Sequence, residues 1–399
     1  MTPTRAALVL PAAVLVLSGC GAVATATAHN TTDSYARTDA APHTVAPVTS
    51  PATAAPAPAT PAAHASQPDI VVTVPISSSS GTEWLEILNA AGTVLAKTEI
   101  DPTVTWMTAA GAGGAYWAQD GQEHELTPSG AVRTLGAVPA DANAVLIAPD
   151  GASYAYATSD TAKDGIATNR IVVVAPGAAP RVIADRTSDP NHPTSDAPPD
   201  GWNYYLISWT APGIAFARVP SGGCGCGSFD MQMQSADSAV INPATDVVTT
   251  LTADSLCPLS AVSPSLETVC FAGTTATDAI RIGSRGALVH NFTLSGSNVA
   301  GDAVFASGSA ELAYITIPES QDTCGATITP TLRILNLSTG AAVARNSGDF
   351  APMAWPAGGP ILGEMTSGAN TWVATVDPAT FATTELTTAA AEAQFVGIM

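Results

Sequence analysis

The triplet Glu123-His124-Glu125 places a histidine between two carboxylates, a residue type and spacing that could transfer a proton. Acidic neighbours favour the charged imidazole, which would suit a general acid. Successive side chains of a β-strand point to opposite faces, however, so His124 would lie opposite both glutamates. We therefore interpret His124 as a residue of a surface hairpin.

Aromatic residues form a second group with possible chemistry. Rings at this density could stack on a sugar or on a flat, drug-sized ring, and they are the candidate ligand-binding residues of the chain. The alternative is that they fill space between packed sheets. The group consists of Trp202, Tyr204, Tyr205 and Trp209.

Other motifs of catalysis or cofactor binding are absent from the sequence. There is no GxSxG nucleophile elbow, no HExxH zinc motif, no Walker phosphate loop and no GxGxxG that opens a helix. We therefore assign no catalytic residue and expect no cofactor and no metal ion.

The start of the chain has the layout of an export signal. Arg5 is followed by the apolar run Ala6–Leu17 and then by the small residues Ser18 and Gly19. The run is about 12 residues long, whereas a helix that spans a bilayer needs roughly 20. We expect residues 1–19 to be a signal peptide.

The end of this segment, Leu17-Ser18-Gly19-Cys20, resembles the lipobox of bacterial lipoprotein signal peptides. The resemblance implies that the lipoprotein signal peptidase reads Leu17, Ser18 and Gly19 and cuts before Cys20. It also implies a diacylglyceryl thioether on Cys20, which would hold the protein on the outer face of the cytoplasmic membrane. Attached acyl chains contribute about 0.8 kcal/mol per buried methylene, so two or more give a stable anchor.

Five further cysteines would then lie on the oxidising side of the membrane, where structural disulfides are expected. A zinc site at Cys224-Gly225-Cys226 would need more ligands, and no histidine is nearby. Because five is odd, at least one thiol stays free or pairs elsewhere, and a bridge from Cys224 or Cys226 to Cys257 is favoured. The disulfide candidates are Cys224, Cys226, Cys257, Cys270 and Cys324.

Composition separates a linker from a folded domain and limits the partners. Residues 20–68 are mostly Ala, Thr, Pro and Ser after the cysteine, and such a segment cannot bury enough apolar surface to fold. The domain would occupy residues 69–399. The chain has 13 basic and 33 acidic residues, a net charge of -20, which argues against nucleic acid and against a basic membrane patch.

From Ile70 onward the sequence consists of short β-type runs separated by Gly, Pro, Asp and Ser, with no long helical pattern. The domain is therefore predicted to be all-β. The clearest predicted strands are Ile70–Ile76, Tyr154–Ala157, Ile171–Val174, Leu312–Ile317, Leu332–Leu337 and Trp372–Val376.

Two turn patterns alternate along the domain. One is a turn before a strand of small and aromatic residues, as in Ala148-Pro149-Asp150-Gly151 before Tyr154-Ala155-Tyr156, with copies ahead of Ile214, Val269, Leu312 and Ile361. The other is a hairpin turn, usually opened by Asn or Asp, near positions 92, 130, 177, 244, 286, 340 and 379. Repeats of 40 to 60 residues with about four strands each are typical of propeller blades.

The turn-plus-strand copies resemble the repeats of TolB-like and WD40-like bacterial β-propellers, and the resemblance implies that fold. Seven hairpin marks predict seven blades, with six as the alternative. Ile70–Ile76 would pair with the last strand, near Phe395–Ile398, to close the ring, and each turn would lead into the innermost strand of a blade. Two β-sandwiches would require a second linker, and none follows Pro68.

Two functions remain open. The first is a monomeric, membrane-anchored lipoprotein whose propeller binds a protein, peptide or glycan. The second is a propeller enzyme, such as a lyase or glycan-active hydrolase, which would gather Asp, Glu or His at the starts of the innermost strands. The positions assigned to those starts read mostly Ala, Ser, Pro and Gly, which favours binding.

Overall fold

The computed structural model describes most of the chain from Pro68 to the C-terminus. The predicted signal peptide, Cys20 and nearly all of the predicted linker lie outside the described residues. No described helix is long and apolar enough to cross a membrane. The residues outside the description are 1–67, 77–80, 102, 111–112, 162–165, 189–201, 221–236, 253–258, 273–278, 285, 295–297, 309, 322–327, 347, 369 and 389–391.

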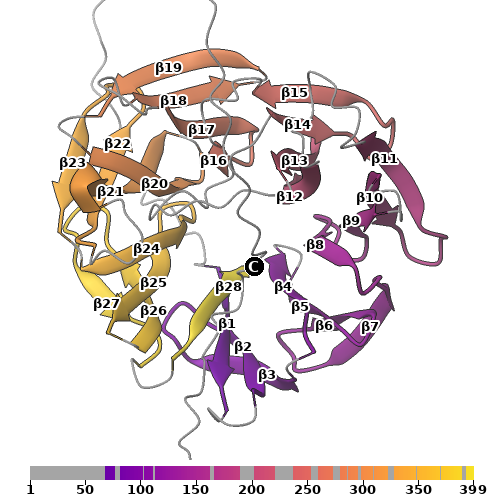
Figure 1. Ribbon diagram of the computed structural model, residues 1–399. Helices are drawn as coiled ribbons and strands as arrows, with labels where there is room; N and C mark the ends of the chain where they lie inside the picture. Colours follow the sequence, from indigo (N-terminus) through magenta and orange to yellow (C-terminus); the bar gives the residue numbers. More distant parts are fainter. Residues whose placement is uncertain are drawn as a thin grey trace, which may run out of the picture. The chain divides into compact units, whose positions relative to one another are not determined.

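The strands form seven antiparallel sheets of four strands each, arranged in a ring (Figure 1), which confirms the predicted seven-bladed β-propeller. Blade 1 is β28-β1-β2-β3, blade 2 is β4 to β7, blade 3 is β8 to β11, blade 4 is β12 to β15, blade 5 is β16 to β19, blade 6 is β20 to β23 and blade 7 is β24 to β27. A single 3-10 helix, Glu319–Gln321, is the only helical element among the described residues.

Each blade runs outward from the axis, and all six strands predicted with clear boundaries are present. The innermost strands are β28 (Gln394–Ile398), β4 (Trp106–Ala110), β8 (Ala142–Ile147), β12 (Trp202–Thr210), β16 (Leu259–Val262), β20 (Asn298–Phe305) and β24 (Asp349–Ala354). The second strands are β1 (Ile70–Pro75), β5 (Gly114–Gln119), β9 (Tyr154–Thr161), β13 (Gly213–Pro220), β17 (Glu267–Ala272), β21 (Glu311–Pro318) and β25 (Ile361–Ser367). The third strands are β2 (Glu83–Leu88), β6 (Gln122–Leu126), β10 (Ala167–Val174), β14 (Asp237–Ile241), β18 (Ala279–Ser284), β22 (Thr331–Asn336) and β26 (Asn370–Val376). The outermost strands are β3 (Val94–Ile100), β7 (Val132–Ala137), β11 (Arg181–Ser188), β15 (Val248–Thr252), β19 (Ala287–Thr293), β23 (Ala342–Arg345) and β27 (Thr383–Glu385).

Blade 1 is assembled from both ends of the domain. β28 pairs with β1 in antiparallel register, with Ile70 opposite Ile398 and Thr73 opposite Gln394, as predicted. The Met399 amide extends the ladder by donating to the Asp69 carbonyl at 3.0 Å. The last strand therefore completes the first blade, and the ring cannot open without breaking this pairing.

The two turn patterns lie at the same end of every blade, which we name the turn face. All seven predicted hairpin marks join the third strand to the outermost one. The other pattern joins the innermost strand to the second: Asp150, for example, accepts hydrogen bonds from the Ala152 and Ser153 amides at 2.9 Å between β8 and β9. The prediction that this turn leads into the innermost strand is wrong.

The reason for that error is how the strands are covered. A second strand is paired on both edges and packed on both faces, so its sequence is the most apolar of the blade. β21 illustrates this, with six consecutive buried residues. The innermost strand has one edge without a partner strand and tolerates smaller, more polar residues. The small-aromatic pattern therefore marks second strands.

Bulges shape the inner ring. Six of the seven innermost strands lose register against the second strand, and β4 alone pairs without interruption. A bulge bends a strand and increases its twist, which helps short strands converge on an axis. The bulges also touch: the Ala303 amide, in the bulge of β20, donates to Ser260 Oγ, in the bulge of β16, at 3.3 Å.

Apolar layers between neighbouring blades form the core. The layer between blades 3 and 4 holds Tyr204 against Phe216, with the rings edge to face and their centroids 5.2 Å apart. The layer between blades 4 and 5 is thinner and contains the buried residues Ala215, Val240, Leu251 and Leu266. The propeller is thus held by side chains between blades and by hydrogen bonds within them.

Removal of residues 394–399 should strongly destabilise the domain. The truncation deletes β28 with its partly buried Phe395, Val396 and Ile398 and leaves β1 as an open edge. We expect the melting temperature to fall by on the order of 10 °C in a calorimetric scan. A truncated protein that melts at the temperature of the full chain would contradict the closure.

Candidate binding site

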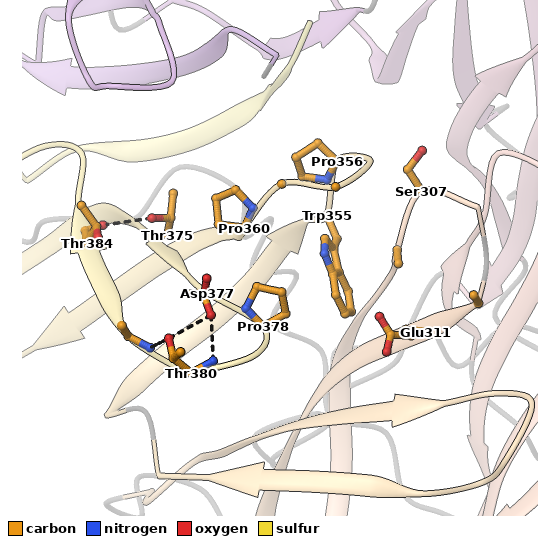
Figure 2. A pocket seen from close by; sticks show the side chains of 15 residues that line it. Ser307, Glu311, Trp355, Pro356, Pro360, Thr375, Asp377, Pro378, Thr380 and Thr384 are labelled. Carbon is orange, nitrogen blue, oxygen red and sulfur yellow. Dashed lines mark hydrogen bonds between the residues drawn. The ribbon is translucent and has the colours of Figure 1, made fainter. Parts of the chain in front are cut away.

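A pocket of about 710 Å3 opens on the turn face between blades 6 and 7 (Figure 2). Three turns build it: β20 to β21, β24 to β25 and β26 to β27. Its polar lining consists of Ser307, Glu311, Thr375, Asp377, Thr380 and Thr384. Its apolar wall consists of Trp355, Pro356, Pro360 and Pro378, with small residues between them.

The blade 7 hairpin holds Asp377 in a fixed conformation. Asp377 Oδ1 accepts hydrogen bonds from the Ala379 amide at 3.0 Å and from the amide and hydroxyl of Thr380 at 2.7 and 2.8 Å. These hydrogen bonds, with those from Thr380 contributing most, hold the pKa of Asp377 below its usual value. The carboxylate is exposed and therefore stays ionised at neutral pH.

Blade 6 supplies the opposite side of the pocket. The Ser307 amide donates to the Trp355 carbonyl at 3.0 Å and so ties the two blades together at the pocket. Trp355 is 7% exposed and packs into the apolar layer between blades 6 and 7. Glu311, the first residue of β21, is partly buried.

The lining can accept hydrogen bonds and positive charge. Among the described residues that line the pocket there are two carboxylates and several hydroxyls, and no lysine, arginine or histidine. In the described part of the chain, no group of three or more His, Cys, Asp or Glu residues could hold a metal ion. The pocket therefore has the composition of a site that binds polar or positively charged groups.

The axis was the place expected to carry catalytic groups in an enzyme. The first residues of the innermost strands are Gln394, Trp106, Ala142, Trp202, Leu259, Asn298 and Asp349, of which only the last is a carboxylic acid. Burial raises the pKa of Asp349 above its usual value. The starts of the innermost strands that the structure shows therefore do not bring several acidic residues together.

Alternation along β12 separates the predicted aromatic group. Tyr204 is 7% exposed and Trp209 packs against the same layer between blades 3 and 4, so both belong to the core. Tyr205 points away from that layer and is 42% exposed on its innermost strand. The side chain of Trp202 lies outside the description. Tyr204, Tyr205 and Trp209 do not line the pocket between blades 6 and 7.

The Glu123-His124-Glu125 triplet lies on β6, the third strand of blade 2. His124 is opposite both glutamates, as predicted, and stacks on Trp117 with the ring centroids 5.1 Å apart. His124 itself is half-buried. On the opposite face of the strand, Glu123 is 1% and Glu125 3% exposed. Their face is covered by blade 3, a long-range contact that alternation within one strand cannot reveal.

The two glutamates differ in their partners. Glu125 pairs with the Arg133 guanidinium and lies 3.5 Å from the Tyr116 hydroxyl. Glu123 Oε2 has no hydrogen-bond partner, and burial raises the pKa of Glu123 to about 8. The blade interface thus contains one paired carboxylate and one carboxylic acid that is neutral at pH 7.

The sequence located the turns of the pocket without showing that they meet. Trp355–Gly358 and Asp377–Thr380 were both recognised as turn patterns, but nothing local marks them as neighbours. One feature of the sequence distinguishes the hairpin at the pocket. It opens with Asp377 in blade 7, whereas the corresponding hairpins of blades 1, 4 and 6 open with Asn89, Asn242 and Asn336.

Of the predicted disulfide residues, only Cys270 lies in the described part of the chain. It is on β17 and is disulfide-bonded. Cys224, Cys226, Cys257 and Cys324 lie outside the described residues, so the connectivity stays a prediction.

Comparison with known proteins supports the fold and gives no family. No protein-family model and no curated protein matches the chain. Among solved structures, Pyrococcus horikoshii acylaminoacyl peptidase is 10% identical with a TM-score of 0.51, over 80% of this chain and 50% of that one. TolB from Acinetobacter baumannii is 11% identical with a TM-score of 0.40, over 83% of each chain.

A TolB protein from Agrobacterium tumefaciens is 15% identical with a TM-score of 0.38, over 67% of this chain and 88% of that one. The chain spans about half of the acylaminoacyl peptidase and 44% of a similar prolyl endopeptidase. At these identities the likeness shows the fold alone. The protein is a seven-bladed β-propeller.

Glu123 should make the stability of the propeller depend on pH. Its folded-state pKa of about 8 lies above its ordinary value of 4.5, so the stabilisation by the neutral acid is complete below about pH 4.5 and is lost as the pH rises through 8. Glu123→Gln, which cannot ionise, should melt several degrees higher than the wild type at pH 9.

The matched control is Glu125→Gln, which removes a carboxylate on the same face that is paired with Arg133. This variant should melt below the wild type at both pH 6 and pH 9. Thermal melts at pH 6 and pH 9 separate the two variants. Equal pH dependence in the wild type and Glu123→Gln would show that Glu123 is not the titrating group.

Proposed function

We propose that this protein is a lipid-anchored extracytoplasmic binding protein whose propeller holds a protein, peptide or glycan partner in the pocket between blades 6 and 7. The pocket carries the proposal. At about 710 Å3 it lies in the range of roughly 300–1,000 Å3 that is usual for ligand sites. Three turns of two blades frame it, so it is formed by the rigid ring itself.

The chemistry of the lining supports binding over catalysis. Carboxylates and hydroxyls face an apolar wall of prolines and one tryptophan, a mixture that orients a ligand by hydrogen bonds and buries part of its surface. Among the described side chains, no group of three or more His, Cys, Asp or Glu residues could hold a metal ion.

Two features support the compartment. Leu17-Ser18-Gly19-Cys20 has the lipobox pattern, and the polar, proline-rich segment behind it would let the domain stand away from the bilayer. The disulfide at Cys270 fits the oxidising environment outside the cytoplasmic membrane. Both are consistent with a domain displayed on the outer face of that membrane.

Filling the pocket tests the binding function. Ala310 is exposed and lines the pocket, and its carbonyl accepts a hydrogen bond from the Leu337 amide that substitution leaves in place. Ala310→Trp should lower the affinity for ligands selected on glycan and peptide arrays by about tenfold or more. Ala152→Trp, in the corresponding turn of blade 3, is the matched control and should bind as the wild type does. Arrays without any ligand that Ala310→Trp weakens would overturn the proposed function.

Replacement of the lipobox cysteine tests the anchor. In a bacterium with the lipoprotein pathway, the full-length protein should fractionate with membranes and carry labelled fatty acid. Cys20→Ala should abolish the label, and an inhibitor of the lipoprotein signal peptidase should cause the uncleaved precursor to accumulate. A wild-type protein released without lipid into the medium would contradict the anchor.

A further inference from the structure

We infer that the pocket between blades 6 and 7 recognises a positively charged side chain, lysine or arginine, presented by a peptide or protein partner. The inference rests on the proposed function and specifies its ligand. It depends on the position of Asp377, on the absence of cationic side chains from the described lining and on the apolar wall.

The repeated blades provide an internal comparison for Asp377. In blades 1, 4 and 6 the same hairpin position is asparagine, and Oδ1 of Asn89, Asn242 and Asn336 accepts backbone amide hydrogen bonds at 2.9 to 3.1 Å. Asp377 Oδ1 makes the equivalent bonds. The turn therefore needs only a neutral acceptor, and the negative charge of Asp377 is an addition that the turn does not explain.

The pocket does not neutralise this charge internally. Other carboxylates of the propeller have cationic partners, such as Asp246 with Arg181 at 2.7 Å and Glu125 with Arg133. In the described part of the chain, neither Asp377 nor Glu311 forms an ion pair. Figure 2 shows the two carboxylates on different sides of the pocket, one on each blade.

The wall of the pocket suits the rest of such a side chain. Lysine and arginine bury their methylene stems against apolar surface while the charged group stays with polar partners. Trp355, Pro356, Pro360 and Pro378 provide this surface beside the carboxylates. The volume of about 710 Å3 exceeds one side chain, so residues next to the cation also fit.

A neutral glycan fits this distribution less well. Sugar hydroxyls can hydrogen-bond to neutral acceptors and donors and do not need charged ones. Two carboxylates that no cation neutralises would add a desolvation cost when a neutral sugar binds. A cation instead gains from pairing with either carboxylate, and the net charge of -20 would attract basic partners over a longer range. We therefore choose the cationic side chain over the sugar.

The test uses the full-length protein and blocked pentapeptides, Ala-Ala-Xaa-Ala-Ala, in which Xaa is Lys, Arg, Gln or Glu. Fluorescence polarisation at low ionic strength should show about tenfold or tighter binding of the Lys and Arg peptides than of the Gln peptide, with no binding of the Glu peptide. Raising the salt concentration should weaken the Lys and Arg complexes most.

Asp377→Asn isolates the charge, because asparagine keeps the hydrogen bonds of the turn. It should reduce binding of the Lys peptide by about tenfold while the melting temperature stays within about 2 °C of the wild type. Asn242→Asp, which adds the same charge at the same turn position of blade 4, is the matched control and should not restore binding in the Asp377→Asn background. Glu311→Gln should weaken the Lys peptide as well.

The outcomes separate the inference from the function on which it rests. If Lys and Gln peptides bind equally, if Asp377→Asn binds as the wild type does, or if no peptide binds, the inference is overturned. If a neutral peptide or a glycan nevertheless binds and Ala310→Trp blocks it, the binding function stands with another ligand. If no ligand of any class depends on the pocket, the proposed function fails too.

Discussion

The pairing of β28 with β1 is the constraint on which the rest of this molecule depends. A blade is only one sheet thick, so its faces are buried solely by its neighbours, and the neighbours stay in place only while the ring is closed. The closing strand also reaches blade 7, where the Phe395 amide donates to Glu364 Oε1 at 2.6 Å. Blade 7 is thus held on one side by the closure and on the other by the apolar layer it shares with blade 6. The pocket lies on that held pair of blades.

Features set by local conformation could be predicted from the sequence. The hairpins opened by Asn89, Asn242, Asn336 and Asp377 are specified by residues that accept hydrogen bonds from their own turn. Together with the turn marks near positions 130, 177 and 286 they indicate seven blades, and the β-type runs at the two ends of the domain indicate the closure. Features set by contacts between blades could not. The burial of Glu123 and Glu125 could not be predicted because nothing in β6 indicates that blade 3 covers them. The order of strands across a blade was misread for the same reason, since both strands beside a turn share its local pattern.

Comparison of the repeated blades separates residues that the fold needs from residues that the fold does not explain. Where blades 1, 4 and 6 use asparagine to hold a hairpin, blade 7 uses aspartate and gains a charge that the fold does not need. The buried Glu123 is the opposite case, a carboxyl group whose burial favours its neutral form. One acid is exposed, ionised and beside a pocket, whereas the other is enclosed between blades. Their surroundings, and not their residue type, make the first a candidate for recognition and the second a determinant of stability.

A crystal structure of the protein grown with the pentapeptide that has lysine at its centre would test the central claim most directly. The claim predicts electron density for the peptide between blades 6 and 7, with the lysine ammonium within hydrogen-bond distance of the Asp377 carboxylate and the methylene stem against the prolines of the wall. A peptide that is ordered elsewhere on the propeller while the pocket holds only solvent would contradict it.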